Sequence, residues 1–350
     1  MRGSRAGEPR ISNMRVGLTY NLKREVKDSD GLPDDFYLEC DDLDTVEAVK
    51  SAILARHEEV VMIEATEDAY QKLRQTRPEI VFNMAEGLWG ESRESQMPAI
   101  MEMLRIPYTG SSPLSLALCL NKARAKEILS YYGIPNPGFV VTSDPGIDIA
   151  RYLKFPLIVK PLYEGSSKGI KNDSLVSSRA EFSDRVARIA GDYKQPALVE
   201  EYLCGREFTV ALIGNADKVR VLPIVEINYS SLPEGINPIY SYEAKWILDK
   251  PDDPLDIFAC PADVDERLRR SIEKAAVDAF RALDVKDWCR IDVRLDHAGT
   301  PNIIELNPLP GILYDPKCNS CFPKAARTAG MDFTALINAV IDTARERYGI

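Results

Sequence analysis

The sequence contains no run of 18 apolar residues, so it offers no candidate for a transmembrane helix. It also lacks a basic excess, because 44 lysines and arginines stand against 54 aspartates and glutamates and leave a formal net charge of −10. A protein that binds phosphate backbones or anionic bilayers needs a basic surface. This balance argues against nucleic-acid and membrane partners and leaves small molecules as the expected ligands.

Histidine is scarce, and cysteine shows no pairing pattern. His57 and His297 are the two histidines, and we expect both on the surface, which argues against a histidine-based hydrolase triad. Seven cysteines, an odd number spread along a long chain, favour reduced thiols over a disulfide framework. Cys318 and Cys321 form the one close pair, but no further zinc ligands lie near them in the sequence. We therefore expect a cytoplasmic protein without a structural metal at this pair.

Apolar periodicity predicts alternating strands and helices, beginning at Met14. Residues 1–13 contain no apolar run and are interpreted as a tag or leader. Strands are expected at residues 14–20, 60–63, 80–83, 157–160, 197–200, 207–214, 219–227, 288–295 and 302–307. Helices are expected at residues 43–57, 114–132, 265–283 and 333–341. The early strands predict a small open parallel sheet that ends near Tyr108, and the later ones favour hairpins. The expected fold class is α/β followed by α+β.

A lysine at the end of a strand precedes a loop rich in glycine and serine. Lys160 ends the expected strand, and Gly165-Ser166-Ser167-Lys168-Gly169 follows. Glycines let backbone N–H groups approach a polyphosphate, and the two serine hydroxyls add donors. The loop is not a Walker motif, because Lys160 precedes the glycines and no Gly-Lys-Ser/Thr follows them. A solvated hairpin turn has a similar composition and is the alternative interpretation.

Two neighbouring strands carry polar side chains at alternating positions. Arg290 and Asp292 are two residues apart on one strand, and Glu305 and Asn307 repeat the spacing on the next. Such side chains leave the same face of a strand, so a hairpin would gather all four, with Ile304 directed to the core. Two carboxylates and an amide oxygen suit Mg²⁺ that bridges phosphates, and the arginine suits charge on a transferring phosphoryl group. A salt-bridged solvent face is the alternative.

A series of short motifs follows in one order from about residue 80 to the C-terminus. The series comprises Pro107-Tyr108-Thr109-Gly110-Ser111, Asn121-Lys122, residues 160–169, residues 200–210, Tyr242-Glu243-Ala244-Lys245, Arg290-Ile291-Asp292-Val293, Glu305-Leu306-Asn307 and Ala325-Ala326-Arg327. In these motifs the chain resembles the ATP-grasp ligases, and among them the D-alanine–D-alanine ligase branch. The resemblance implies an ATP-grasp fold of three domains that holds ATP between two antiparallel sheets. It also implies phosphorylation of a carboxylate by ATP, followed by attack of an amine on the acyl phosphate.

The same resemblance implies domain boundaries and site residues. The expected domains are an N-terminal α/β domain at 14–110, a central domain with a phosphate flap at 111–203, and a C-terminal domain with the Mg²⁺ and substrate site at 204–350. Lys122 and Lys160 are expected to bind the ATP phosphates, and the flap is expected to contain Gly165, Ser166, Ser167 and Gly169. Adenine is expected to contact Glu200, Glu201, Tyr202 and Leu203. Glu207 is expected to bind the ribose. Two Mg²⁺ ions, or Mn²⁺ in their place, are assigned to Asp292, Glu305 and Asn307. Catalytic roles near the transferring phosphate and the intermediate are assigned to Ser166, Lys245, Arg290 and Gly311.

The expected site for the carboxylate donor departs from the family. The family holds the donor ammonium with an acid, but Lys23 stands at that position. A tyrosine that joins the same hydrogen-bonded set is replaced by Trp246. A family histidine is missing from the loop that contains Glu86. Arg290 and Ser320 remain to bind the carboxylate of an amino-acid acceptor.

These departures favour an ADP-forming ligase that joins an amino acid to a small-molecule acid. Because Lys23 would repel an ammonium, the expected donor lacks a free α-ammonium group or carries extra negative charge. A ligase of specialised metabolism, of the mycosporine type, fits that description. An authentic D-alanine–D-alanine ligase is the first alternative, and a non-catalytic nucleotide-binding protein is the second. The family is commonly dimeric, so a homodimer is expected.

Overall fold

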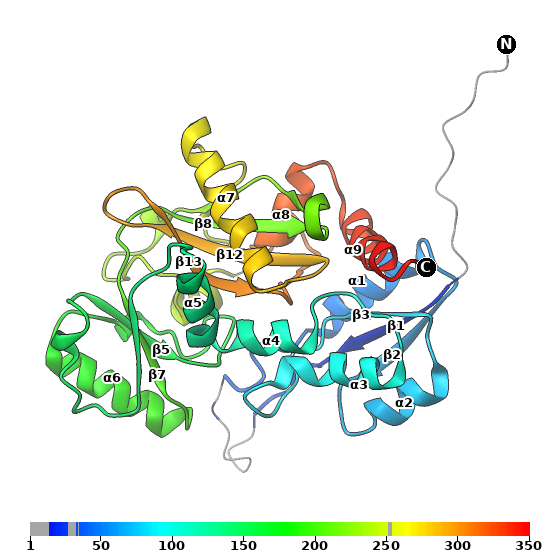
Figure 1. The fold of residues 1–350 in the computed structure, drawn as a ribbon, viewed down its shortest axis with the longest axis horizontal. Coiled ribbons are helices and arrows are strands. Elements are labelled where there is room, and N and C mark those ends of the chain that lie inside the picture. Colours follow the sequence, from blue (N-terminus) through cyan, green and yellow to red (C-terminus); the bar gives the residue numbers. More distant parts are fainter. Residues whose placement is uncertain (1–13, 27–32, 34, 251–253) are drawn as a thin grey trace.

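The computed structural model describes residues 14–26, 33, 35–250 and 254–350, so the interpretation of residues 1–13 lies outside it. Within these residues the strands form three sheets, each packed against helices (Figure 1). None of the described helices combines the length and apolarity needed to cross a bilayer. The domain boundaries proposed above agree with the order of the sheets along the chain and stay a prediction.

The first sheet is parallel, with strand order β2-β1-β3. Its strands are β1 (Arg15–Tyr20), β2 (Glu59–Glu64) and β3 (Ile80–Asn83), and its helices are α1 (Leu43–Leu54), α2 (Ala69–Thr76) and α3 (Gln96–Leu104). Val81 forms an isolated parallel bridge with Tyr108, which confirms the predicted open sheet and its end. Val16 and Leu18 point to one face of β1 and share a core with Ile53 of α1.

The last helix, α9 (Phe333–Tyr348), packs against α1, although the two are far apart in sequence (Figure 1). Leu336 and Val340 are fully buried in the core that α1 shares with the first sheet. The side-chain amide of Asn338 donates to the carbonyl of Ala52 at 2.8 Å. The C-terminal residues therefore complete the N-terminal core.

The second and third sheets are antiparallel and carry the site. The second, in the order β4-β7-β5-β6, contains β4 (Phe139–Thr142), β5 (Leu157–Pro161), β6 (Leu175–Val176) and β7 (Ala197–Glu201), and α6 (Arg179–Asp192) packs on it. The third, in the order β11-β10-β8-β12-β13 with β9 beside β8, contains β8 (Glu207–Ile213), β9 (Arg220–Val221), β10 (Val225–Ile227), β11 (Phe258–Ala259), β12 (Trp288–Leu295) and β13 (Pro301–Asn307). Helix α7 (Glu266–Ala282) covers one face of the third sheet, and α8 (Cys321–Thr328) packs near β8 and β10 (Figure 1).

Three local expectations are wrong. The helix expected at 114–132 is two helices, α4 (Pro113–Leu120) and α5 (Lys122–Tyr131), because the Asn121 side chain caps a new helix by accepting the Arg124 N–H at 3.1 Å. The strand expected at 219–227 is divided into β9 and β10, and Pro223, which lacks an N–H, lies between them. His57 is buried, with 3% of its surface exposed, whereas His297 is exposed as expected.

Candidate active site

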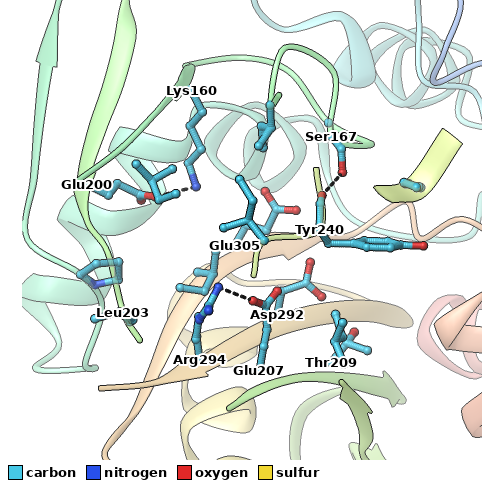
Figure 2. Close-up of a pocket in the computed structure, with 18 of the residues that line it drawn as sticks. Lys160, Ser167, Glu200, Leu203, Glu207, Thr209, Tyr240, Asp292, Arg294 and Glu305 are labelled. Carbon is cyan, nitrogen blue, oxygen red and sulfur yellow. Dashed lines mark hydrogen bonds and ion pairs between the residues drawn. The ribbon is translucent and has the colours of Figure 1, made fainter. Parts of the chain in front are cut away.

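A pocket lies between the second sheet and the third, and we call it the inter-sheet pocket. Figure 2 shows Lys160 and Glu200 on one wall and Glu207, Asp292 and Glu305 on the other. Of the predicted site residues, it is lined by Lys160, Gly165, Ser166, Ser167, Glu200, Glu201, Tyr202, Leu203, Glu207, Lys245, Arg290, Asp292 and Glu305. The expected pocket between two antiparallel sheets is therefore confirmed.

Three buried charges form a chain along the first wall. Glu200 of β7 pairs with Lys160 of β5 at 2.6 Å and with Lys126 of α5 at 2.7 Å. None of the three side chains is more than 4% exposed. Burial alone would raise the pKa of Glu200, but Lys126 and Lys160 lower it, so the carboxylate is charged. Its charge holds the Lys160 ammonium at the wall of the pocket.

Arg294 organises the opposite end of the same pocket, and no motif indicated it. Its guanidinium pairs with Glu207 at 2.9 Å (Figure 2). The same group donates to the Tyr202 hydroxyl at 3.0 Å. It also lies over the rings of Tyr202 and Tyr229, at 4.8 and 5.4 Å from their centroids. These contacts hold Glu207, which is predicted to bind ribose, against residues 200–203, which are predicted to bind adenine.

The hairpin of β12 and β13 gathers the four predicted polar residues. Arg290 faces Asn307, and Asp292 faces Glu305, in the antiparallel register. The Arg290 guanidinium donates two hydrogen bonds to Asp292, at 3.0 and 2.9 Å. A bulge after Asp292 shifts the register, so Ile304 lines the pocket and not the core, which corrects its expected direction. The predicted convergence of the polar groups is confirmed.

Cations surround the central carboxylate of this hairpin. Glu305 lies 3.4 Å from Lys122 and 3.7 Å from Arg290. Burial alone would raise its pKa, but Lys122, Lys160 and Arg290 hold the pKa of Glu305 at about 2. Burial raises the pKa of Asp292 despite the adjacent Arg290, and the negative Glu305 adds to the rise. Of the two carboxylates, Glu305 therefore keeps its negative charge to the lower pH.

The donor set suits Mg²⁺ that is shared with phosphates. The side-chain amide nitrogen of Asn307 donates to Asp292 at 3.3 Å and to Glu305 at 3.4 Å, so the amide and the two carboxylates meet at one place. In the described part of the chain, no group of three or more His, Cys, Asp or Glu side chains could hold a metal. Mg²⁺ usually keeps waters and takes phosphate oxygens from its substrate. Two carboxylates and one amide oxygen therefore fit a nucleotide-bound ion, and their metal roles stay predictions.

Polar anchors hold the glycine- and serine-rich loop over the pocket. The Gly165 N–H donates to Glu39 at 2.7 Å, and the Ser167 hydroxyl donates to the Tyr240 carbonyl at 2.7 Å (Figure 2). The two loop serines have φ of 49° and 62°, a left-handed conformation that non-glycine residues seldom adopt. These hydrogen bonds, together with the Lys168–Glu164 ion pair at 2.9 Å, hold the loop in this shape.

Lys23 and Trp246 contact each other outside the inter-sheet pocket. The Lys23 ammonium lies 5.2 Å from the centroid of the Trp246 ring and 3.9 Å from Asp42. The indole N–H donates to the Ser166 carbonyl at 3.1 Å. A cation–π contact thus stands where the resemblance implies a hydrogen-bonded acid, serine and tyrosine. Neither side chain lines the inter-sheet pocket, and the donor-site roles of Lys23 and Trp246 stay predictions.

A second pocket adjoins the first, shares Gly165, Ser166 and Arg290 with it, and is called here the acidic pocket. The predicted residues that line it are Glu86, Lys122, Gly165, Ser166, Arg290, Asn307 and Gly311. Glu39, Asp41 and Glu94 also line it, although sequence reasoning did not select them. Arg290 therefore stands at the junction between a pocket suited to a nucleotide and a pocket rich in carboxylates.

Besides Lys23 and Trp246, the predicted residues Ser320 and Gly169 line neither pocket. The Ser320 hydroxyl accepts the Leu313 N–H at 3.2 Å and donates to the Gly311 carbonyl at 3.3 Å. Gly169 has a φ of +68°, and a Cβ there would lie 2.4 Å from Pro161, so the end of the loop requires glycine. Both residues shape neighbouring backbone, and the substrate role of Ser320 stays a prediction.

Comparison with known proteins agrees with this arrangement. Residues 129–342 match the family model described as the D-ala D-ala ligase C-terminus. The chain is 32% identical over 318 residues to the D-alanine–D-alanine ligase of Pelotomaculum thermopropionicum, covering 88% of this chain and 93% of that protein. It is 39% identical over 271 residues to the uncharacterized protein y4sG of Sinorhizobium fredii, covering 77% of this chain and 75% of that protein.

Solved structures show the same fold. A crystal structure of the D-alanine–D-alanine ligase from Bacillus anthracis aligns with a TM-score of 0.72 and 25% identity, over 95% of this chain and 98% of that chain. A crystal structure of that ligase complexed with ATP aligns with a TM-score of 0.70 and 22% identity over the same shares. The expected fold class is confirmed.

Proposed function

This chain belongs to the D-alanine–D-alanine ligase family of ATP-grasp enzymes, and from that premise we propose that it is an ADP-forming ligase that joins a carboxylate to an amine. In the first step an oxygen of the donor carboxylate attacks the γ-phosphorus of ATP, and ADP leaves. In the second step the acceptor nitrogen attacks the acyl carbon, the amide C–N bond forms, and phosphate leaves. The proton lost by the amine passes to the departing phosphate or to water.

The observation that carries this proposal is the junction of the two pockets at Arg290. A nucleotide between the sheets would direct its phosphates toward Lys160 and Lys122, since both ammonium groups border the Glu305 patch. A donor in the acidic pocket would then meet the terminal phosphate beside Arg290. Holding two reactants next to each other in this way contributes a large part of the rate acceleration in enzymatic transfer reactions.

Each residue at the junction has a chemical task under this proposal. Lys245 and Arg290 oppose the negative charge that develops on the transferring phosphoryl group and on the tetrahedral intermediate. Asp292, Glu305 and Asn307 would hold Mg²⁺, with two ions or Mn²⁺ as the finer proposal, and the metal would neutralise phosphate charge. The loop 165–169 excludes water, which would otherwise hydrolyse the acyl phosphate.

The identity of the donor separates the remaining alternatives. An authentic D-alanine–D-alanine ligase would use D-alanine at both positions. The mycosporine-type ligase would instead use a donor without a free α-ammonium group, and its support is the replacement of a family acid by Lys23 and of a family tyrosine by Trp246, two residues that contact each other. We also propose that the enzyme acts as a homodimer in the cytoplasm, where ATP is available and its seven free cysteines stay reduced.

The test is phosphate release by the purified full chain with ATP, Mg²⁺ and single amino acids or pairs of them. Release that requires both an acid and an amine, with a matching new amide product by mass spectrometry, supports the ligase. D-alanine alone is the control for the family's ordinary reaction. Tight ATP binding without acid-dependent release in any combination would favour the non-catalytic alternative.

A further inference from the structure

Four carboxylates line the acidic pocket, and they differ in their partners. Glu39 pairs with Arg93 at 2.6 Å and accepts the Gly165 N–H at 2.7 Å. The side chains of Asp41, Glu86 and Glu94 form no hydrogen bond or ion pair with any residue that the structure describes. Glu39 thus belongs to the framework of the flap, and the other three are available to an occupant.

Glu94 is the most informative of the three. Only 8% of its surface is exposed, yet its carboxylate lines the pocket with no hydrogen bond or ion pair among the described residues, and the nearby cations that oppose the rise of its pKa are Arg93 and Lys122. Burial raises the pKa of Glu94 to about 7, and burial also raises that of Glu86, with Glu94, Glu39 and Asp41 adding to the rise. A buried carboxyl without a partner is costly unless a ligand compensates it.

The nearby cations are already engaged. Arg290 donates two hydrogen bonds to Asp292, and Lys122 lies 3.4 Å from Glu305. The guanidinium of Arg93 is directed to Glu39 at 2.6 Å, to Glu164 at 3.4 Å, and to a backbone carbonyl. The pocket therefore holds a surplus of carboxyl groups over cations. Burial and neighbouring acids raise the pKa of Asp41, Glu86 and Glu94, and a cationic ligand would favour their charged form.

A metal ion is a poor explanation for this surplus. No group of three or more acidic, histidine or cysteine side chains within the described ranges could hold an ion. Asp41, Glu86 and Glu94 therefore do not form a metal-binding group, and an organic ligand with separate nitrogen groups is the occupant that fits them.

We propose that the donor of the ligase proposed above is a basic amino acid, whose carboxylate lies at Arg290 and whose two cationic nitrogens lie against Asp41, Glu86 and Glu94. One carboxylate suffices for an α-ammonium, so three of them leave room for a second ammonium or guanidinium group. The acids come from the segments that follow β1 and β3, whereas Ser320, expected to bind the acceptor carboxylate, follows β13 and lines neither pocket. The cationic end therefore belongs to the donor and not to the acceptor.

The test compares amino acids that differ only in the second charge. The pairs are lysine and norleucine, arginine and citrulline, and 2,4-diaminobutyrate and 2-aminobutyrate, each as both enantiomers. Each is supplied with ATP, Mg²⁺ and a fixed mixture of neutral amino acids as acceptors, and phosphate release is measured. At least one cationic member should exceed its neutral counterpart at least tenfold in kcat/KM, which corresponds to about 1.4 kcal/mol. Neutral members that equal or exceed their cationic counterparts would overturn the proposal.

Two variants and one matched control connect the preference to these acids. The double variant Glu86→Gln with Glu94→Gln keeps the shape of the pocket and removes two charges, so the cationic preference should fall at least tenfold while the KM for ATP changes less than twofold. Glu91→Gln alters an exposed acid of the same loop that lines neither pocket, and the preference should be kept. An unchanged preference in the double variant would overturn the assignment to these residues.

Direct binding separates this inference from the ligase proposal. The full chain saturated with ADP and Mg²⁺ is titrated calorimetrically with each pair of amino acids. If no acid supports phosphate release but the cationic members still bind at least tenfold tighter, the ligase proposal fails and the cation site stands. Equal binding of cationic and neutral members, or binding of neither, would overturn the cation site.

Discussion

Replacement of Glu305 by alanine tests the chemistry of the candidate site most directly. Its carboxylate lies 3.4 Å from Lys122 and 3.7 Å from Arg290 and is charged at all ordinary pH values, because its pKa is about 2. At about 4 Å and an effective dielectric constant near 20, each unit-charge pair is worth up to about 4 kcal/mol. An oxygen ligand with such charge should be essential to a phosphate-bound Mg²⁺.

We expect the variant to lose kcat by about 100-fold or more, which corresponds to about 2.7 kcal/mol of transition-state stabilisation. Lys122, Lys160 and Arg290 remain, so ADP binding measured without Mg²⁺ should be retained. Titration of Mg²⁺ against phosphate release separates a weaker metal site from a slower step. Glu226→Ala is the matched control, because Glu226 lies on β10 of the same sheet, pairs with Arg206 and lines neither pocket. Near-normal turnover of Glu305→Ala would refute the metal assignment.

Two further predictions concern the loop and the pH profile. Hydrogen exchange at residues 165–169 should slow when ADP and Mg²⁺ are added. A few polar contacts hold this segment, and the phosphates would supply further hydrogen bonds to it. Equal protection with and without nucleotide would argue against a flap. Burial and the adjacent Arg290 lower the pKa of Lys245 to about 8, so the ammonium loses its charge as the pH rises through 8, and kcat/KM for ATP should fall over that range. Lys245→Arg should keep its charge and abolish the fall, and an identical profile in that variant would assign the titration to another group.

Much of the site could be predicted because its residues are close together in the sequence. The alternation of side chains along β12 and β13 places Arg290, Asp292, Glu305 and Asn307 on one face by geometry alone. The bulge after Asp292 could not be foreseen, since nothing in the apolar pattern marks it, and it turns Ile304 into the pocket.

Contacts between distant segments were beyond the reach of sequence patterns. Glu39 contacts Gly165 across 126 residues of sequence. No motif around Glu39 indicated that contact. Lys126 lies on the buried face of α5, where its pairing with Glu200 makes an otherwise costly charge tolerable. The contact of Lys23 with Trp246, which is more than 200 residues away in sequence, was likewise not visible in the sequence.

The packing of α9 on α1 has a consequence for how the protein is made. Asn338 reaches Ala52 across 286 residues, and Leu336 and Val340 cover the same core as Ile53. A ribosome adds about 5 to 20 residues each second, so α1 waits on the order of 15 to 60 seconds for its covering helix. During that interval the apolar face of α1 is available to a chaperone, and a chain released before Phe333 would leave that face permanently uncovered.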